Sequence, residues 1–170
     1  MTLPERIGRY HVLGYLASGG MAEILLGKLL GPGGFEQPVV IKRALPHLAR
    51  QREFHDMFLD EARVVARIQH PNVVAVTELG EEASELYMVM EYLAGESVAG
   101  LVKRLRGEPL PLDVALYVVA EALAGLHAAH ELVGDDGAPL GLVHRDVSPH
   151  NLFVTYDGRV KLLDFGIAKF

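Results

Sequence analysis

Side chains with chemical capability lie close together in the stretch LVHRDVSPHNLFV. Asp146 could accept a proton from an alcohol, and the amide oxygen of Asn151 could bind a hard cation such as magnesium. Asp164, at the end of the apolar run in LLDFG, could supply a charged oxygen ligand to the same ion. Two alternatives stay open, namely a transition-metal site formed by His144, Asp146 and His150, and a structural hydrogen-bond network.

Two further charges interrupt apolar patterns earlier in the chain. In VVIKRA alternate residues share one face of a strand, so Lys42 lies on the same face as Val40. In the helical pattern that follows, Glu61 lies on the apolar stripe, one turn after Phe58. A pair between Lys42 and Glu61 would explain both positions, and removing one partner of a buried pair costs about 3–5 kcal/mol. The alternative is two unrelated charges in contact with water.

Local patterns predict the elements that must position these residues. Strands are expected in YHVLGYL, ILLGKLL and VVIKRAL, with GPGG as the turn between the last two. Residues 51–69 have helical spacing, and HPN ends that helix. VVAVTEL and ELYMVMEYL predict two more strands around GEEAS. After Gly95 we expect a short helix, a long apolar helix from Pro111 to about His130, and a hairpin about residues 156–158.

This order of elements predicts an α+β chain in two lobes, with a hinge between Glu91 and Gly95. The apolar run LDVALYVVAEALAGL is shorter than the roughly 18 residues that a membrane-spanning helix needs, so we interpret it as a buried helix. Apolar residues surround this helix, and we expect that the rest of the chain cannot cover them all. They are Val114, Leu116, Tyr117, Val118, Val119 and Leu123.

Composition excludes several classes of protein. A chain of 170 residues, half of them hydrophobic, is long enough for a folded domain, and its net charge of −6 argues against binding to nucleic acid or to an anionic membrane surface. The sequence has no cysteine, which excludes disulfides and thiolate metal sites and fits a reducing compartment. The first residues, MTLPERIGRYHVLG, carry charges where a signal peptide has its apolar core, so we expect a cytoplasmic location.

The motifs together resemble the protein kinase fold, specifically the eukaryotic-like serine/threonine kinases of bacteria. LASGGMAEI, VVIK, Glu61 followed by HPNVV, HRD with a later Asn, and DFG occur in the family order. The resemblance extends from about Tyr10 to Lys169. It implies one partial kinase domain over residues 1–170, with a complete β-rich small lobe at about 10–93 and the start of the mainly helical large lobe at about 94–170.

The resemblance also implies a role for each site residue. Lys42 would hold the α- and β-phosphates of ATP and would be fixed by Glu61. Asp146 would be the catalytic base for the substrate hydroxyl, and Asn151 and Asp164 would bind Mg²⁺. In the same resemblance, ATP would be bound by Leu16, Ala17, Gly19, Ile24, Val40, Lys42, Met90, Glu91, Leu93 and Phe153.

The chain departs from the family pattern in three places. Ala17 and Ala22 replace two of the loop glycines and leave Gly19, so the loop is expected to be stiffer. Ser148 occupies the position of a lysine that neutralises the transferred phosphate, so we expect either a lower rate or another cation in its place. The change also weakens the distinction between serine/threonine and tyrosine specificity. The sequence stops at Phe170, soon after DFG, so we expect a fragment or a truncated relic without the substrate-binding part.

The sequence therefore predicts an ATP- and Mg²⁺-dependent kinase that transfers the γ-phosphoryl group to Ser/Thr hydroxyls of a protein substrate. The alternative is a nucleotide-binding, pseudokinase-like interaction module without phosphotransfer. The early end of the chain and Ser148 favour the module, whereas the complete set of catalytic residues favours the kinase. A histidine-ligated metal enzyme is a third, remote hypothesis.

Overall fold

The structure is a computed structural model that describes residues 3–82 and 85–165, with Glu61 described by its backbone alone. The chain forms two compact units. The first unit contains the chain as far as Ala66 together with Val76–Tyr92. The second contains Arg67–Ala75 and the described chain from Leu93 onward.

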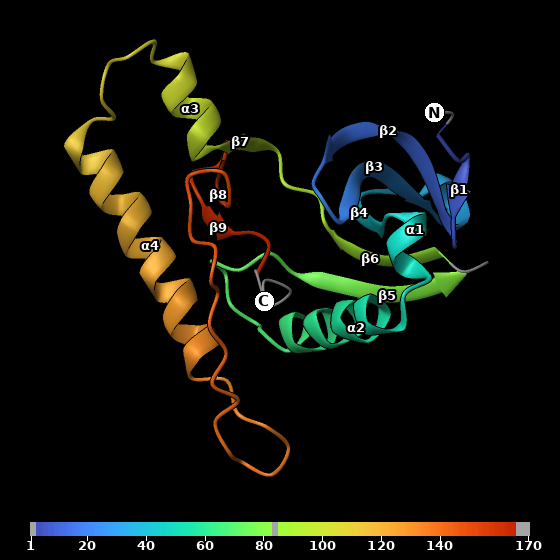
Figure 1. The fold of residues 1–170 in the computed structure, drawn as a ribbon. Helices are drawn as coiled ribbons and strands as arrows, with labels where there is room; N and C mark the ends of the chain where they lie inside the picture. The colour runs from blue at the N-terminus through green and yellow to red at the C-terminus, as the bar shows by residue number, and fades with distance from the viewer. Residues whose placement is uncertain (1–2, 83–84, 166–170) are drawn as a thin grey trace. The chain divides into compact units, whose positions relative to one another are not determined.

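The first unit is built on a six-stranded antiparallel sheet with the order β1-β2-β3-β4-β6-β5 (Figure 1). The strands predicted in YHVLGYL, ILLGKLL and VVIKRAL are present, and a short 3₁₀ turn at Pro32–Gly34 joins the last two as expected. The short strand β1 was not predicted. The strands are β1 (Arg6–Ile7), β2 (Tyr10–Ser18), β3 (Ala22–Leu30), β4 (Glu36–Ala44), β5 (Val76–Glu82) and β6 (Glu85–Glu91).

Strand register determines which residues share a face of this sheet. Lys42 on β4 pairs with Ile24 on β3 and with Met88 on β6. Met88 in turn pairs with Leu79 on the edge strand β5. Because directly paired residues point to the same side, these four side chains form a row across one face, which we call the Lys42 face.

The opposite face, which we call the Tyr87 face, holds a compact apolar core. Tyr87 occupies the space above two glycines, because a Cβ atom on Gly8 or on Gly80 would overlap the atoms of its phenol ring. This close approach packs the turn between β1 and β2 against the β5–β6 hairpin. The buried residues of the core are Ile7, Tyr10, Leu25, Val39, Ile41, Tyr87 and Val89.

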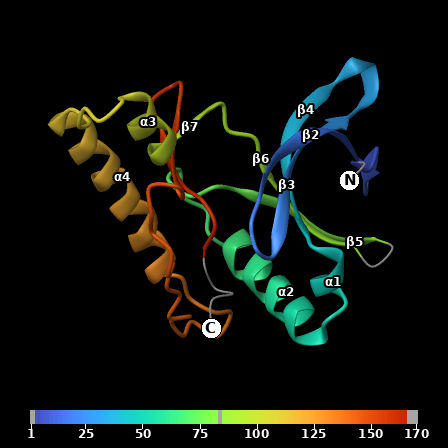
Figure 2. The same cartoon turned by 45° about the horizontal axis from the view of Figure 1, so that its top comes forward.

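Helix α2 (Arg52–Ala66) follows the short helix α1 (Pro46–Ala49) and lies alongside β5 in both views (Figure 1, Figure 2). Its predicted apolar stripe is confirmed, because Phe54 and Phe58 are buried with ring centroids 6.1 Å apart. The helix ends at Ala66, three residues before the end of its predicted range. The short α1 was not predicted.

The second unit combines two helices with a three-stranded antiparallel sheet in the order β7-β8-β9. Pairing of β8 with β9 confirms the predicted hairpin about residues 156–158, whereas β7 was not predicted. The hydroxyl of Ser97 accepts a hydrogen bond from the Gly100 N–H and caps the short predicted helix. The elements are β7 (Gly95–Ser97), α3 (Val98–Arg104), α4 (Leu112–His130), β8 (Leu152–Thr155) and β9 (Val160–Leu162).

The predicted strand VVAVTEL is wrong at its start, because β5 begins at Val76. The preceding residues hydrogen-bond to β9 within the second unit. Val74 N donates to Leu162 O at 3.0 Å, and Leu162 N donates to Asn72 O at 2.8 Å. The backbone of Asn72 and Val74 therefore hydrogen-bonds to a strand far along the chain and does not extend β5.

Helix α4 forms where predicted, but the interpretation of it as a buried helix is wrong for the described chain. Only one face is covered, and the residues buried there are Val118, Ala122, Gly125 and Ala129. The expectation that this chain does not cover the other sides is confirmed, since Leu116 and Leu123 are 61% and 58% exposed. By length and composition alone α4 could also cross a membrane, a criterion that core helices of soluble proteins also meet.

Candidate active site

Five of the predicted nucleotide-binding residues of the first unit lie on the Lys42 face. Ala17 on β2 pairs with Ile24, which pairs with Lys42. Val40 lies two residues before Lys42 on β4 and pairs with Met90 on β6. Strand pairing thus brings five predicted site residues from four strands onto one face.

The turn between β2 and β3 closes one end of this group. Gly19 N donates to Ala22 O at 2.8 Å, which makes the turn tight. Leu16 is half exposed on β2 beside this turn. Glu91, at the end of β6, pairs with Val39 on β4, so its backbone belongs to the same unit.

The predicted pair between Lys42 and Glu61 stays a prediction. Lys42 is partly buried on β4, and Glu61 lies in α2, which packs on the same unit. The side chain of Glu61 lies outside the described residues. Two other predicted nucleotide-binding residues, Leu93 and Phe153, belong to the second unit, where Phe153 on β8 pairs with Lys161 on β9.

Asn151 links the loop that carries Asp146 to the segment that carries Asp164. Its Nδ2 donates to Asp146 O at 2.9 Å, and its backbone N donates to Ser148 O at 2.9 Å. Its carbonyl oxygen accepts from Leu163 N at 2.8 Å. These three bonds bring the loop that carries Asp146 next to the segment that carries Asp164.

His144 also fixes this loop, and its side chain is buried, with 1% exposure. The Asp146 N–H donates to its Nδ1 at 3.3 Å, so Nε2 carries the proton and donates to Leu163 O at 2.9 Å. The ring packs against Phe165 with centroids 4.4 Å apart. Burial lowers the pKa of His144, and the carbonyl of Leu163 only partly opposes this effect. The ring is therefore neutral and holds the loop through two hydrogen bonds.

The backbone is strained at two positions beside the hydrogen bonds of His144 and Asn151. Arg145 has φ 60° and Asp164 has φ 34°, in the left-handed region that favours glycine. Such conformations cost about 1–3 kcal/mol each and persist where surrounding contacts enforce them, commonly at functional sites. Here the bonds of His144 and Asn151 supply those contacts.

The donor chemistry of the second unit fits magnesium better than a transition metal. The Nδ2 atom of Asn151 faces Asp146 O, so its Oδ1 points away from that contact. Together with the carboxylate of Asp164 it offers the hard oxygen atoms that magnesium prefers. Among residues 3–82 and 85–165, no group of three or more His, Cys, Asp or Glu side chains is placed to hold a metal ion.

A buried polar contact supports β9, and sequence reasoning missed it. Asn72, with 6% exposure, donates from Nδ2 to Glu121 Oε2 at 2.7 Å and to Val160 O at 2.9 Å. The buried Lys161 donates from Nζ to Val73 O at 3.3 Å. The sequence did carry a signal, because Glu121 is a lone carboxylate in the middle of the apolar helix α4.

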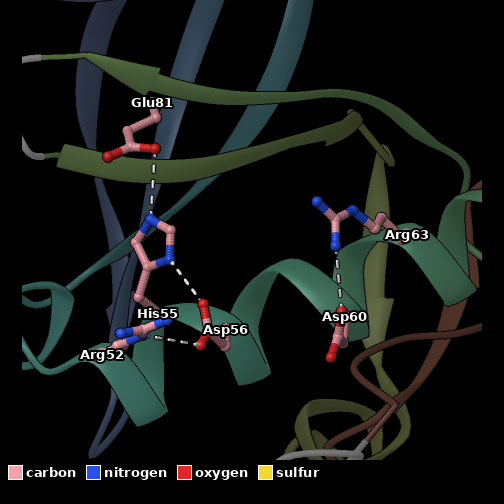
Figure 3. A network of polar contacts seen from close by, with 6 residues as sticks. All are labelled: Arg52, His55, Asp56, Asp60, Arg63 and Glu81. Atoms are coloured by element: carbon pink, nitrogen blue, oxygen red, sulfur yellow. Dashed lines mark hydrogen bonds and ion pairs between the residues drawn. The ribbon is translucent and has the colours of Figure 1, made fainter.

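A second missed network lies on α2 (Figure 3). His55 stands between two carboxylates, Asp56 on its own helix and Glu81 on β5. Arg52 pairs with Asp56 from the preceding turn. No periodicity in the sequence indicates that His55 and Glu81 meet, since 26 residues separate them.

Comparisons with known proteins agree with the resemblance. Residues 10–170 match the family profile described as "Protein kinase domain". Tyrosine-protein kinase MasK of Myxococcus xanthus is 53% identical over 172 residues, which cover 99% of this chain and 26% of MasK. Serine/threonine-protein kinase PrkC of Bacillus subtilis is 32% identical over 169 residues, with 99% of this chain and 24% of PrkC covered.

A solved structure has the same fold. The crystal structure of the Mycobacterium tuberculosis PknI kinase domain superposes with a TM-score of 0.78 and 30% sequence identity, over 99% of this chain and 64% of that one. The predicted α+β fold is thereby confirmed. The chain spans about a quarter of the length of the two curated relatives above.

Proposed function

The chain belongs to the protein kinase domain family, and from this premise we propose that it carries the nucleotide site and catalytic loop of an ATP- and Mg²⁺-dependent enzyme that phosphorylates hydroxyl groups of proteins. Because the chain covers 26% of MasK, the activity, the substrates and the partners of the whole protein are all part of this proposal.

The observation that carries the proposal is the set of hydrogen bonds around Asn151. Its bonds to Asp146, Ser148 and Leu163 hold an acid, an amide and the segment that carries a second acid in one small region. Phosphoryl transfer needs little covalent chemistry from the protein, so catalysis depends mainly on positioned charges and donors. Polar groups held in place by hydrogen bonds are suited to that task.

Within this proposal each residue has a defined task. Asp146 accepts the proton of the substrate hydroxyl and orients its oxygen, while Lys42 holds the phosphates of ATP. Asn151 and Asp164 hold Mg²⁺, which when bound neutralises charge on the phosphate oxygens. The apolar side chains on the Lys42 face, including Ile24 and Val40, contact the adenine ring.

Serine and threonine are the proposed acceptors, because PrkC and other relatives of 32–36% identity are named serine/threonine kinases. Tyrosine is a second candidate, since MasK is named a tyrosine-protein kinase and is 53% identical. Ser148, which replaces the lysine typical of serine/threonine kinases, leaves both candidates open. Analysis of the phosphorylated amino acid in a generic protein substrate distinguishes the two.

The central test compares the wild-type chain with Lys42→Met, Asp146→Asn and a surface control, Arg63→Gln. Calorimetric titration with MgATP measures binding, and transfer of labelled γ-phosphate to a generic protein measures catalysis, in the 170-residue chain and in any longer in-frame product. We expect Lys42→Met to weaken binding about tenfold or more, because it removes a charged contact to phosphate. Asp146→Asn should bind MgATP but lose about 10²–10⁴-fold in transfer. Binding without transfer in the wild type would favour the interaction module, and absence of binding would refute the nucleotide site.

A further inference from the structure

A histidine in the amino-terminal half of α2 contacts the sheet. The Nε2 atom of His55 lies 3.3 Å from Glu81 Oε2 on β5, and its Nδ1 atom lies 3.5 Å from Asp56 Oδ1 (Figure 3). Carboxylate oxygens only accept hydrogen bonds, so Nε2 of the ring donates to Glu81. Arg52 Nε lies 3.9 Å from the other oxygen of Asp56.

The position of His55 around the helix relates this contact to the position of Glu61. At about 100° per residue, His55 and Glu61 lie about 120° apart around the axis of α2. Between them runs the apolar stripe that contains Phe58 and Ala62, both buried. His55 and Glu61 therefore flank the stripe on opposite sides. Because both residues belong to one helix, a contact that fixes His55 against β5 also fixes the rotational position of Glu61.

Glu81 lies on the same face of the sheet as Lys42. It follows Leu79 by two residues on β5, and Leu79 belongs to the row that crosses the sheet to Lys42 through Met88. A contact from α2 to Glu81 is thus made on the face that carries the proposed phosphate-binding lysine. Glu78, three residues before Glu81 on β5, points to the opposite face of the sheet. There, on the Tyr87 face, it bonds to Tyr10.

We propose that His55 and Glu81 are a positioning pair that sets the rotation of α2 about its axis, so that Glu61 is presented to Lys42. The proposal deepens the proposed function, since it rests on the role given there to Glu61. His55 contacts neither nucleotide nor reacting atoms in this scheme and acts through the helix. Loss of the pair lets α2 turn, which weakens the hold of Glu61 on Lys42 and with it the grip on the phosphates.

The helix provides its own control. Asp60 and Arg63 form an ion pair at 3.2 Å that lies within α2, and their side chains are 71% and 65% exposed. Glu81→Gln and Asp60→Asn make the same chemical change, from carboxylate to amide, but only the first weakens the contact between helix and strand. The side chains of His55 and Glu81 are 26% and 54% exposed, so neither His55→Ala nor Glu81→Gln is expected to prevent folding.

The test uses the 170-residue chain and begins without nucleotide. Hydrogen exchange of the α2 amides reports on local opening of the helix, and the rate of acylation of Lys42, followed by mass spectrometry with Lys28 as internal reference, reports on the environment of that amine. For Glu81→Gln and His55→Ala we expect both rates to rise roughly two- to fivefold, as befits a partly exposed polar contact. Asp60→Asn should match the wild type. His55→Arg, which can again donate to Glu81, should restore both rates.

Titration with MgATP then completes the design. Glu81→Gln should bind MgATP roughly two- to fivefold more weakly than Asp60→Asn. Unchanged acylation of Lys42 in Glu81→Gln, or an equal effect of Asp60→Asn, would overturn the positioning role. Faster exchange with unchanged acylation and unchanged affinity would reduce the pair to a structural contact and overturn it as well. If the wild-type chain does not bind MgATP, the proposed function fails, while exchange and acylation still decide whether the pair controls α2 and Lys42.

Discussion

Replacing Asn72 by alanine removes two hydrogen bonds from a side chain with 6% exposure. One bond, of 2.7 Å, goes to a carboxylate oxygen of Glu121, and the other, of 2.9 Å, goes to Val160 O. A bond to a charged group contributes about 1.5–3 kcal/mol and a neutral one about 0.5–1.5 kcal/mol, and both acceptors lose their donor. We therefore expect Asn72→Ala to lower the free energy of unfolding by about 2–4 kcal/mol.

Asn72→Asp is the more selective change, because it keeps the shape and replaces only the donor. It sets a second carboxylate against Glu121, so the loss should exceed that of Asn72→Ala at neutral pH. Part of it should return in acid, where a protonated carboxyl again supplies a donor. Urea unfolding followed by far-ultraviolet circular dichroism measures the free energies, since the chain has no tryptophan to serve as a probe. The exposed Gln69→Ala is the control. Losses below about 1 kcal/mol for both Asn72 variants would refute the reasoning.

Two further predictions concern packing and titration. Gly80→Ala should lower the free energy of unfolding by about 1–3 kcal/mol, because the added Cβ overlaps the ring of Tyr87. Gly14→Ala is the control, because nothing lies within 4 Å of its added Cβ, and it should not lower the free energy. Urea unfolding compares the two variants. Because burial lowers the pKa of His144, the unfolded chain binds its proton at a higher pH than the native one does. Its contribution to stability is complete above about pH 6.5 and is lost as the pH falls toward the lowered pKa. His144→Gln should flatten the fall of unfolding free energy in this range, His47→Gln should leave it intact, and equal slopes in wild type and His144→Gln would contradict this.

The parts of the fold that follow a local period could be predicted from the sequence. Alternation in VVIKRA placed Lys42 on one face with Val40, and helical spacing placed Phe54 and Phe58 on one stripe; the strand register and the buried rings confirm both. Elements too short to show a period, such as the two-residue β1 and the four-residue α1, were missed. Local patterns report the secondary structure of a segment and leave open which distant segment it will meet.

The candidate site shows the same division. Asp146, Asn151 and Asp164 could be proposed from their types and order, but the hydrogen bonds that join them through Leu163 and His144 could not. Glu121 is instructive, because a lone carboxylate on an apolar helix indicates a buried partner without naming it. Its partner, Asn72, is 49 residues away and belongs to a segment whose pattern had predicted a strand.

The chain passes from one unit to the other at Ala66, at Ala75 and at Tyr92, so no single cut separates the units. Cleavage after Tyr92 would leave the peptide that contains Asn72 with the amino-terminal piece. The carboxy-terminal piece would then lack the donor to Glu121 and the acceptor for Lys161. Limited proteolysis or recombinant halves should therefore yield an amino-terminal piece with its whole sheet and a carboxy-terminal piece that folds only when the other is added back.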